Sequence, residues 1–328
     1  MTRTRLHLYA YRSRTSSRVA SLAISLFLAS RCPAAQQPPA FRSEVNLVDI
    51  TAVVRSTGGS LLRNLDKSDF EVIEDGIPQT IEFFAREAEL PLSLGVIVDV
   101  SGSQNKFLKQ HNQDVAKFLT TVLRPSDQAF AVCFGNHLRL VSEPTSDASS
   151  IMEGFERFQK GSRHFPEIGP QEDRDLGTAL YDALYYSITE KLKTAGERRR
   201  ALVVFSDGEE NSSEHDLLDV IEAAQNTDTV VYCIRYTQEA HGELTARNKY
   251  GARVMRHISN LSGAADFDAL TVRLDTVFEK ISEELRAMYQ IGYVSSNGHP
   301  HDGSFRKLTI RCKQPESIVR AKTGYYAR

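Results

Sequence analysis

Three short segments of the sequence combine hydroxyl and carboxyl side chains with a nearby glycine. The first, DVSGS at positions 99–103, follows a run of apolar residues. The second carries Thr178 at the start of a long amphipathic stretch, and the third carries Ser206 and Asp207 directly after another apolar run. Oxygen ligands of this kind suit hard divalent cations. The candidate metal site comprises Asp99, Ser101, Ser103, Thr178 and Asp207.

The elements that must position these side chains are parallel strands. Apolar, strand-like runs alternate with amphipathic helical stretches through most of the chain, the pattern of an open, mostly parallel sheet with helices on both faces. Ligands bind such Rossmann-like sheets at the carboxyl ends of the strands, where Asp99 and Asp207 lie. A competing interpretation is that both aspartates only cap the helices that follow, but helix capping gives no role to Thr178.

The three segments resemble the metal-ion-dependent adhesion site of von Willebrand factor type A (VWA) domains. DVSGS matches the DxSxS signature of that family, Thr178 its threonine loop and Asp207 its SDG loop. The resemblance covers roughly Leu92 to Leu285 in both motifs and element order. It implies a VWA fold, and it implies a divalent cation, Mg²⁺ first, with Ca²⁺ and Mn²⁺ as alternatives.

The resemblance also implies a role for each site residue. Ser101 and Ser103 would ligate the cation directly. Thr178 would bind it directly or through a water molecule. Asp99 and Asp207 would act mainly through water and by orienting the hydroxyls. One coordination position would stay open for an acidic side chain of a protein partner.

The regions on either side of the predicted VWA domain are rich in alternating, strand-like patterns. In the N-terminal region, Phe70–Glu74 and Gln79–Phe84 are expected to form a hairpin. The C-terminal tail is expected to pack with this region as a small β module, since chain termini often lie close together. These flanks resemble a bacterial exported VWA subfamily through DFEVIEDG at positions 69–76 and GYY at positions 324–326. The predicted organisation is a signal peptide (1–35), a linker (36–42), an N-terminal β module (43–90), a VWA domain (91–288) and a C-terminal β segment (289–328).

The first 35 residues have the composition of a secretory signal peptide. Several arginines precede the apolar run Val19–Ser30, and small residues follow around Ala34 and Ala35. The apolar run is short for a membrane span. The alternatives are an uncleaved membrane anchor and a misassigned start codon. The prediction is an exported protein, periplasmic or secreted, with no membrane span in the mature chain.

Composition and cysteine usage are ordinary for a globular protein. The net charge is -2, with 41% hydrophobic and 25% charged residues, and this gives no reason to expect nucleic acid or an anionic membrane as a partner. Outside the leader, Cys133, Cys233 and Cys312 are odd in number and widely spaced, with no CxxC pair. The spacing favours small buried side chains over a disulfide framework or a zinc site.

Three functions are compatible with the motifs. We favour a protein-binding module for adhesion or complex assembly, which is not an enzyme. A metal-dependent hydrolase is the alternative, with Asp207 or Glu209 as its base, but no HExxH, GxSxG or phosphate-loop motif supports it. In a third, scaffold function the β module would dock with an envelope complex and the metal would be structural. Glu209 and Glu210 could tune cation affinity, but a solvated loop is expected there.

Overall fold

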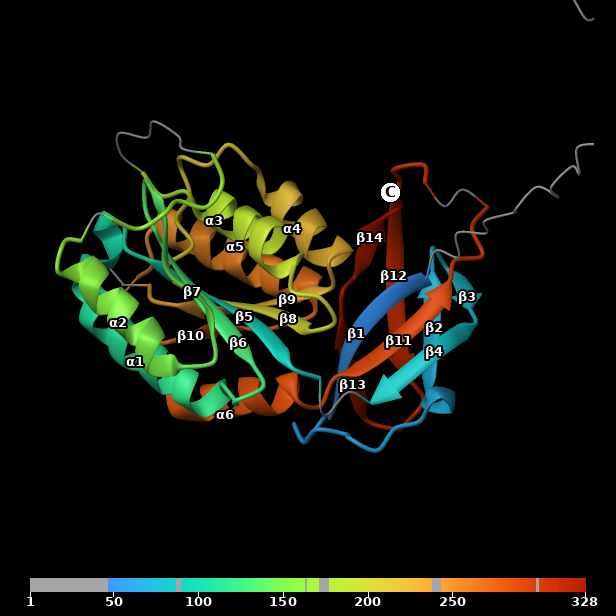
Figure 1. The fold of residues 1–328 in the computed structure, drawn as a ribbon. Coiled ribbons are helices and arrows are strands. Elements are labelled where there is room, and N and C mark those ends of the chain that lie inside the picture. Colours follow the sequence, from blue (N-terminus) through green and yellow to red (C-terminus); the bar gives the residue numbers. More distant parts are fainter. Residues whose placement is uncertain (1–46, 87–89, 163, 171–176, 238–242, 299–300) are drawn as a thin grey trace, which may run out of the picture. The chain divides into compact units, whose positions relative to one another are not determined.

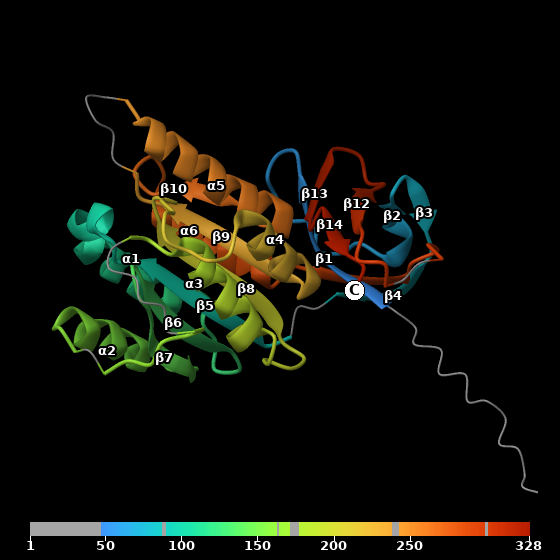
Figure 2. The ribbon, with the colours of Figure 1, turned by 90° about the horizontal axis from the view of Figure 1, so that it is seen from above.

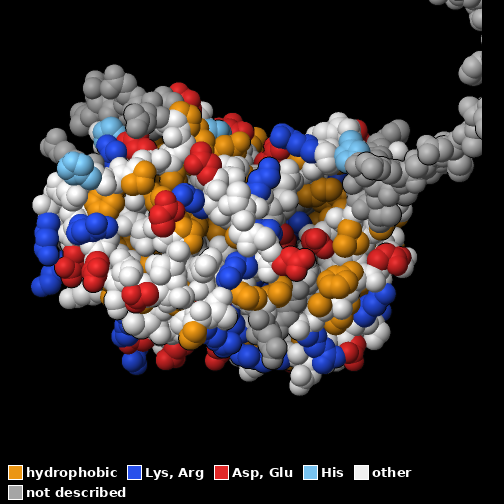
Figure 3. All heavy atoms as spheres, in the orientation of Figure 1, with side chains coloured by type: hydrophobic (Ala, Val, Ile, Leu, Met, Phe, Trp, Pro, Cys, Tyr) orange, Lys and Arg blue, Asp and Glu red, His pale blue; other side chains and the backbone are white. Residues whose placement is uncertain are grey.

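The computed structural model describes residues 47–86, 90–162, 164–170, 177–237, 243–298 and 301–328. The predicted signal peptide and linker lie outside these residues. No helix in the described part of the chain has the length and apolar composition needed to span a bilayer. On the face shown in Figure 3, acidic and basic side chains are interspersed, without a broad patch of either sign.

A six-stranded sheet forms the centre of the α/β domain (Figure 1). Its strand order is β10-β9-β8-β5-β6-β7, in which only the edge strand β7 runs antiparallel to its neighbour. Every residue of β5 is buried, because helices cover both faces of the sheet, and this explains its continuous apolar run. The strands are β5 (Leu92–Asp99), β6 (Gln128–Phe134), β7 (Leu138–Thr145), β8 (Arg199–Ser206), β9 (Thr229–Arg235) and β10 (Asp266–Asp268).

Helices cover both faces of this sheet (Figures 1 and 2). On one face, α1, α2 and α6 contribute to a single apolar cluster with the strands, and on the other, α3, α4 and α5 contribute to a second cluster. The predicted fold class, an open and mostly parallel sheet with helices on both faces, is therefore confirmed. The helices are α1 (Leu108–Val122), α2 (Ala148–Gln159), α3 (Leu180–Tyr186), α4 (Leu217–Asn226), α5 (Ala246–Ser262) and α6 (Leu274–Leu285).

The long amphipathic stretch that begins at Thr178 is not one uniform helix. The α-helical part, α3, ends at Tyr186, and a π-helical segment continues over Ser187–Leu192. Amphipathic spacing cannot distinguish these two forms over so few turns, because both place the same apolar residues against the sheet.

Strands from the two flanking regions pair with one another, as predicted. One sheet has the order β13-β1-β11-β4 and the other β14-β12-β2-β3, with antiparallel pairing throughout. The two sheets share one apolar core, which includes Ile50, Val72 and Tyr293. The strands are β1 (Leu47–Ser56), β2 (Phe70–Glu74), β3 (Ile77–Gln79), β4 (Ile81–Arg86), β11 (Tyr289–Val294), β12 (Phe305–Cys312), β13 (Ser317–Ala321) and β14 (Gly324–Tyr326).

The predicted hairpin of Phe70–Glu74 with Gln79–Phe84 is wrong in its second strand. Asp75 and Gly76, with φ of 48° and 85°, form a tight turn, but across this turn β2 pairs with the short β3 and not with β4. The chain then enters the other sheet, where β4 pairs with β11. Pro78 in β3 has no N–H for a longer ladder, and Ile81 at the start of β4 is buried in the shared core.

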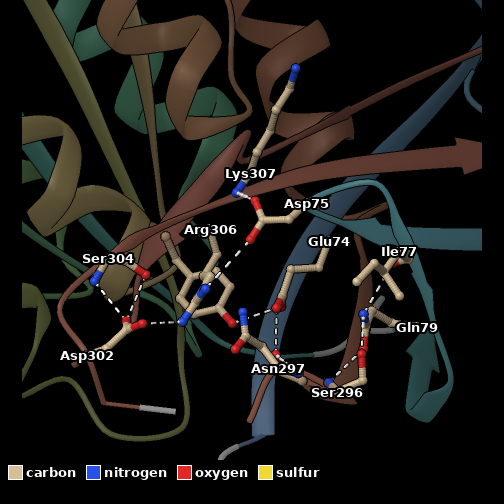
Figure 4. A network of polar contacts seen from close by, with 12 residues as sticks. Glu74, Asp75, Ile77, Gln79, Ser296, Asn297, Asp302, Ser304, Arg306 and Lys307 are labelled. Atoms are coloured by element: carbon tan, nitrogen blue, oxygen red, sulfur yellow. Dashed lines mark hydrogen bonds and ion pairs between the residues drawn. The ribbon is translucent and has the colours of Figure 1, made fainter. Parts of the chain in front are cut away.

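The two motifs that flank the α/β domain meet inside the β module. Figure 4 shows Glu74 and Asp75, of the first motif, within a network of polar contacts there. The buried carboxylate of Glu74, from DFEVIEDG, accepts hydrogen bonds from the hydroxyls of Tyr293 and Ser295. It also accepts one from Tyr325, of GYY, at 2.9 Å. Burial raises the pKa of Tyr325 to about 12, so this hydroxyl remains a donor. The two motifs therefore form one hydrogen-bonded network.

The three cysteines in the described part of the chain are free thiols, as their spacing predicted. Cys133 and Cys233 are buried in the central sheet, and Cys312 is half-buried in the β module. Burial raises the pKa of Cys233 to about 12, so its thiol stays protonated and acts as a small apolar side chain.

Candidate metal centre

The three predicted segments lie at the carboxyl edge of the central sheet. Strands β5 and β8 are parallel neighbours, so their ends bring Asp99 beside Ser206, whose hydroxyl donates to the Asp99 carboxylate at 2.6 Å. Thr178 belongs to a segment attached to the same edge. The N–H of the next residue, Ala179, donates at 2.9 Å to the carbonyl of Gly135, just beyond β6.

The two serines of DVSGS place their hydroxyls side by side. The Oγ atoms of Ser101 and Ser103 are 3.2 Å apart. The N–H of Ser101 donates to Asp99 Oδ1 at 2.9 Å, which folds the segment into a tight local turn. Adjacent ligands of an octahedral Mg²⁺, each about 2.0–2.1 Å from the ion, are separated by about 3 Å. The hydroxyl pair fits that geometry.

Both aspartates are buried and are held by hydrogen bonds within the loops. Asp99 is 0% exposed and Asp207 4% exposed. Asp99 accepts from Ser101 and Ser206, while Asp207 accepts from the N–H of Glu209 at 2.9 Å and from the side chain of Gln104 at 2.7 Å. In the part of the chain that the structure describes, neither carboxylate forms an ion pair with a lysine or arginine.

The electrostatics of the site favour a cation. Burial raises the pKa of Asp99 to about 7; the hydrogen bonds from Ser101 and Ser206 oppose this rise and the charge of Asp207 adds to it. Burial and the charge of Asp207 also raise the pKa of Glu209, with Arg247 opposing. Buried carboxylates are costly unless a positive charge compensates them. A divalent cation at this edge would supply that charge.

Gln104 is a site residue that the sequence motifs did not identify. It is 1% exposed, and its Nε2 donates to Asp207 Oδ2 and, at 3.3 Å, to the carbonyl of Tyr236. Gln104 therefore joins the DVSGS segment to the SDG loop. The sequence offered one signal for Gln104, its position directly after DVSGS. The DxSxS signature specifies no residue at that position, so the motif alone did not identify it.

Histidine does not complete the site. His111 is the buried histidine behind DVSGS, packed edge-on against Tyr236 with ring centroids 4.3 Å apart. Burial lowers its pKa to about 4, so it is neutral at physiological pH. Among the described residues, no three His, Cys, Asp or Glu side chains form a group that could hold a metal, so a cation here would need the hydroxyls as ligands.

A cavity of about 580 Å³ opens beside Ser101. Its lining includes Ser101, Gly102 and Gly135, together with His137 and Arg139. His137 Nδ1 and an Arg139 guanidinium nitrogen lie 2.7 and 3.1 Å from Glu167 Oε1. The cavity leaves room next to Ser101 for a side chain from outside the molecule.

The central sheet and the loops at its edge match the arrangement that the resemblance to VWA domains implied. A six-stranded sheet with one antiparallel edge strand carries the DVSGS, threonine and SDG loops at its carboxyl edge. The chain has the fold of a VWA domain.

Comparison with known proteins gives fold similarity only. No protein-family model matches the chain, and no curated protein matches it. A von Willebrand factor type A protein from Catenulispora acidiphila has 12% identity and a TM-score of 0.44, over 88% of this chain and 74% of that one. An aerotolerance-related membrane protein from Bacteroides fragilis, solved with multiple mutations to serines, has 16% identity and a TM-score of 0.43, over 59% of this chain and 98% of that one.

A further similar structure is proximal thread matrix protein 1 from the mussel byssus, solved with zinc in its metal-ion-dependent adhesion site. It has 13% identity and a TM-score of 0.43, over 63% of this chain and 48% of that one. With identities of 12–16% and TM-scores of 0.43–0.44, the three proteins share only a limited structural likeness with this chain.

We expect stabilisation of this protein by a cation to grow between about pH 5.5 and pH 8. The pKa of Asp99 is about 7 in the folded protein and 3.8 in an ordinary aspartate. The protonated carboxyl stabilises the cation-free fold fully below the ordinary value, and this contribution is lost as the pH rises through about 7. A cation favours the carboxylate instead, so its affinity should fall roughly tenfold for each pH unit below 7.

Thermal melts with and without Mg²⁺ at several pH values measure this effect. Asp99→Asn cannot titrate, so any remaining Mg²⁺ shift in that variant should vary much less with pH. A wild-type shift of equal size at both ends of the range would contradict the prediction.

Proposed function

We propose that this protein is an exported module that binds a divalent cation, Mg²⁺ first, and uses it to bind a protein partner. Ser101, Ser103 and Thr178 would ligate the cation, and Asp99 and Asp207 would orient the hydroxyls and bind through water. The observation that carries the proposal is the pair of buried carboxylates without a positive partner among the described residues, beside two hydroxyls 3.2 Å apart.

The chemistry of the ligand set favours an acidic partner. Hydroxyl ligands are neutral, and the two aspartates already accept hydrogen bonds from Ser206, Gln104 and backbone amides. A cation held mainly by neutral oxygens keeps positive charge toward solvent, where a carboxylate is the strongest complement. The cavity beside Ser101 gives the neighbouring part of the partner a place to bind.

Capture experiments with the full chain test this function. The immobilised protein is incubated with the exported proteins of its own organism in Mg²⁺, in EDTA, and as the Ser103→Ala variant. We expect a protein that is retained only by the wild type in Mg²⁺ and that loses binding when its contacting Asp or Glu is changed to the amide. The same retained set in all three conditions would rule out metal-dependent capture.

One observation favours hydrolysis as the second candidate. His137, held by Glu167, lines the cavity that also contains Ser101 and could act as a base there. A bound cation would supply an activated water. Turnover of a generic ester or phosphate that disappears in Asp207→Ala would favour this function. Stabilisation by Mg²⁺ with neither capture nor turnover would favour a structural metal in a scaffold protein.

A further inference from the structure

The loop that carries Asp207 is bonded to the segment that carries Thr178. Asn211 makes two hydrogen bonds to this one residue: its Oδ1 accepts from the N–H of Thr178 at 2.8 Å, and its own N–H donates to the Thr178 carbonyl at 3.1 Å. Both backbone polar groups of Thr178 are therefore satisfied by a residue of the SDG loop.

Glu210 adds a second link between the same two segments. One carboxylate oxygen accepts from the N–H groups of Ser212 and Ser213, each at 2.8 Å. The other accepts from the N–H of Tyr181 at 2.9 Å and from the Ser213 hydroxyl at 2.7 Å. The expectation that Glu210 belongs to a solvated loop is therefore wrong: its carboxylate satisfies amides of its own loop and of the first turn of α3.

Asp182 completes the connection from the α3 side. It is 0% exposed, and its carboxylate accepts from the N–H groups of Glu214 and His215 and from His215 Nδ1, at 3.1, 3.0 and 2.8 Å. Its own N–H donates to the Ser213 hydroxyl at 3.1 Å. Donors and acceptors thus alternate between the two segments, so neither can shift alone without leaving buried polar groups unpaired.

The close approach of the two segments also requires a glycine at position 177. Gly177 has a φ of 132°, and a Cβ there would lie 2.6 Å from the Cβ of Ser212 and 2.7 Å from Asn211 Oδ1. This close packing indicates the same arrangement as the hydrogen bonds, since Asn211 Oδ1 takes part in both.

We infer that Asn211 and Glu210 are positioning residues that hold Thr178 in place relative to Asp207 before a cation binds. This inference rests on the proposed cation site. The inference adds to the proposed site that the Thr178 segment and the SDG loop form one preformed unit. Gln104 joins the DVSGS segment to that unit. A preformed cage binds more tightly because less conformational freedom is lost on binding.

Titration with Mg²⁺ alone, followed by calorimetry of the full-length protein, measures the effect. Asn211→Ala removes the side-chain acceptor for Thr178, and we expect Mg²⁺ to bind about tenfold more weakly. Asn211→Asp keeps that acceptor and is expected to bind Mg²⁺ at least as tightly as the wild type. The matched control is Asn226→Ala: Asn226 Oδ1 also accepts a backbone N–H, that of Tyr326 at 3.1 Å, but from the C-terminal strand, so Mg²⁺ affinity should not change.

Hydrogen exchange in cation-free protein supplies a readout that does not depend on metal binding. In the wild type, the amides of Thr178 and Tyr181 are expected to be protected before Mg²⁺ is added, and in Asn211→Ala the Thr178 amide should exchange faster. Protection that appears only with Mg²⁺, or wild-type Mg²⁺ affinity in Asn211→Ala, would overturn the inference. A wild type with protected amides but no Mg²⁺ binding would instead overturn the proposed function and the effect on affinity, leaving only a structural link.

Discussion

Replacing Ser101 and Ser103 together by alanine is expected to abolish the increase in thermal stability that Mg²⁺ gives the wild-type protein. A cation at about a hundred times its dissociation constant stabilises the folded state by about 2.7 kcal/mol. For a chain of this size, that corresponds to a rise in Tm of roughly 4–5 °C. The double variant keeps the buried aspartates and loses both hydroxyls, so the shift should fall close to zero in melts with and without Mg²⁺.

Ser282→Ala is the control for this prediction. It is the same chemical change on α6, where the hydroxyl is 3.4 Å from the carbonyl of Thr121, and it should leave the Mg²⁺ shift intact. A shift of wild-type size in the double variant would show that a cation, if it binds, does so elsewhere. The absence of a shift in the wild type with Mg²⁺, Mn²⁺ and Ca²⁺ would refute the cation site itself.

Glu284→Ala is expected to destabilise the protein by about 3 kcal/mol or more. Glu284 lies on α6, is 0% exposed, and accepts from Arg55 of β1 at 2.8 Å, from Tyr232 of β9 at 2.9 Å and from Arg320 of β13. It therefore connects α6 and β9 of the α/β domain to strands of both flanking regions. Removing one member of a buried ionic network leaves its partners uncompensated, which typically costs about 3–5 kcal/mol.

The neighbouring Glu283 provides a control at the next position of the same helix. Its side chain is 59% exposed and its contact with Arg63 is 3.9 Å long. Such a surface pair contributes roughly 0–1 kcal/mol, so urea unfolding of Glu283→Ala should resemble that of the wild type. Equal unfolding free energies for Glu284→Ala and Glu283→Ala would show that the buried network does not stabilise the fold.

The residues at the edge of the sheet could be identified from the sequence because their spacing reflects local geometry. A buried strand must end where its apolar run ends, and parallel neighbours such as β5 and β8 bring their ends together. Asp99 and Asp207 could therefore be placed without coordinates. The resemblance to VWA domains added the order of the parts and the expected roles of the serines.

The supporting residues could not be identified in this way. Gln104, Glu210 and Asn211 act through partners distant in the sequence, and a glutamine or glutamate next to a motif looks the same whether it is solvated or buried. For Glu210, the difference arises because α3 begins beside the loop and presents the N–H of Tyr181 to its carboxylate. Only tertiary packing creates that donor.

The β module shows the same division between local pattern and tertiary structure. Alternating apolar residues determined that Phe70–Glu74 and the region after the turn at Asp75 and Gly76 are extended. This pattern does not predict which strands pair, because an alternation of apolar and polar residues is compatible with pairing in either sheet. That choice was made by the shared core, which draws Ile81 into pairing with β11.

The alternating strands and helices of the α/β domain, and the oxygen-rich loops that follow its strands, could be predicted from the sequence because both depend on neighbours along the chain. The tertiary structure decided how those loops are held: Gln104 joins DVSGS to Asp207, and Asn211 joins Asp207 to Thr178. These connections depend on hydrogen bonds between segments that are brought together only by folding.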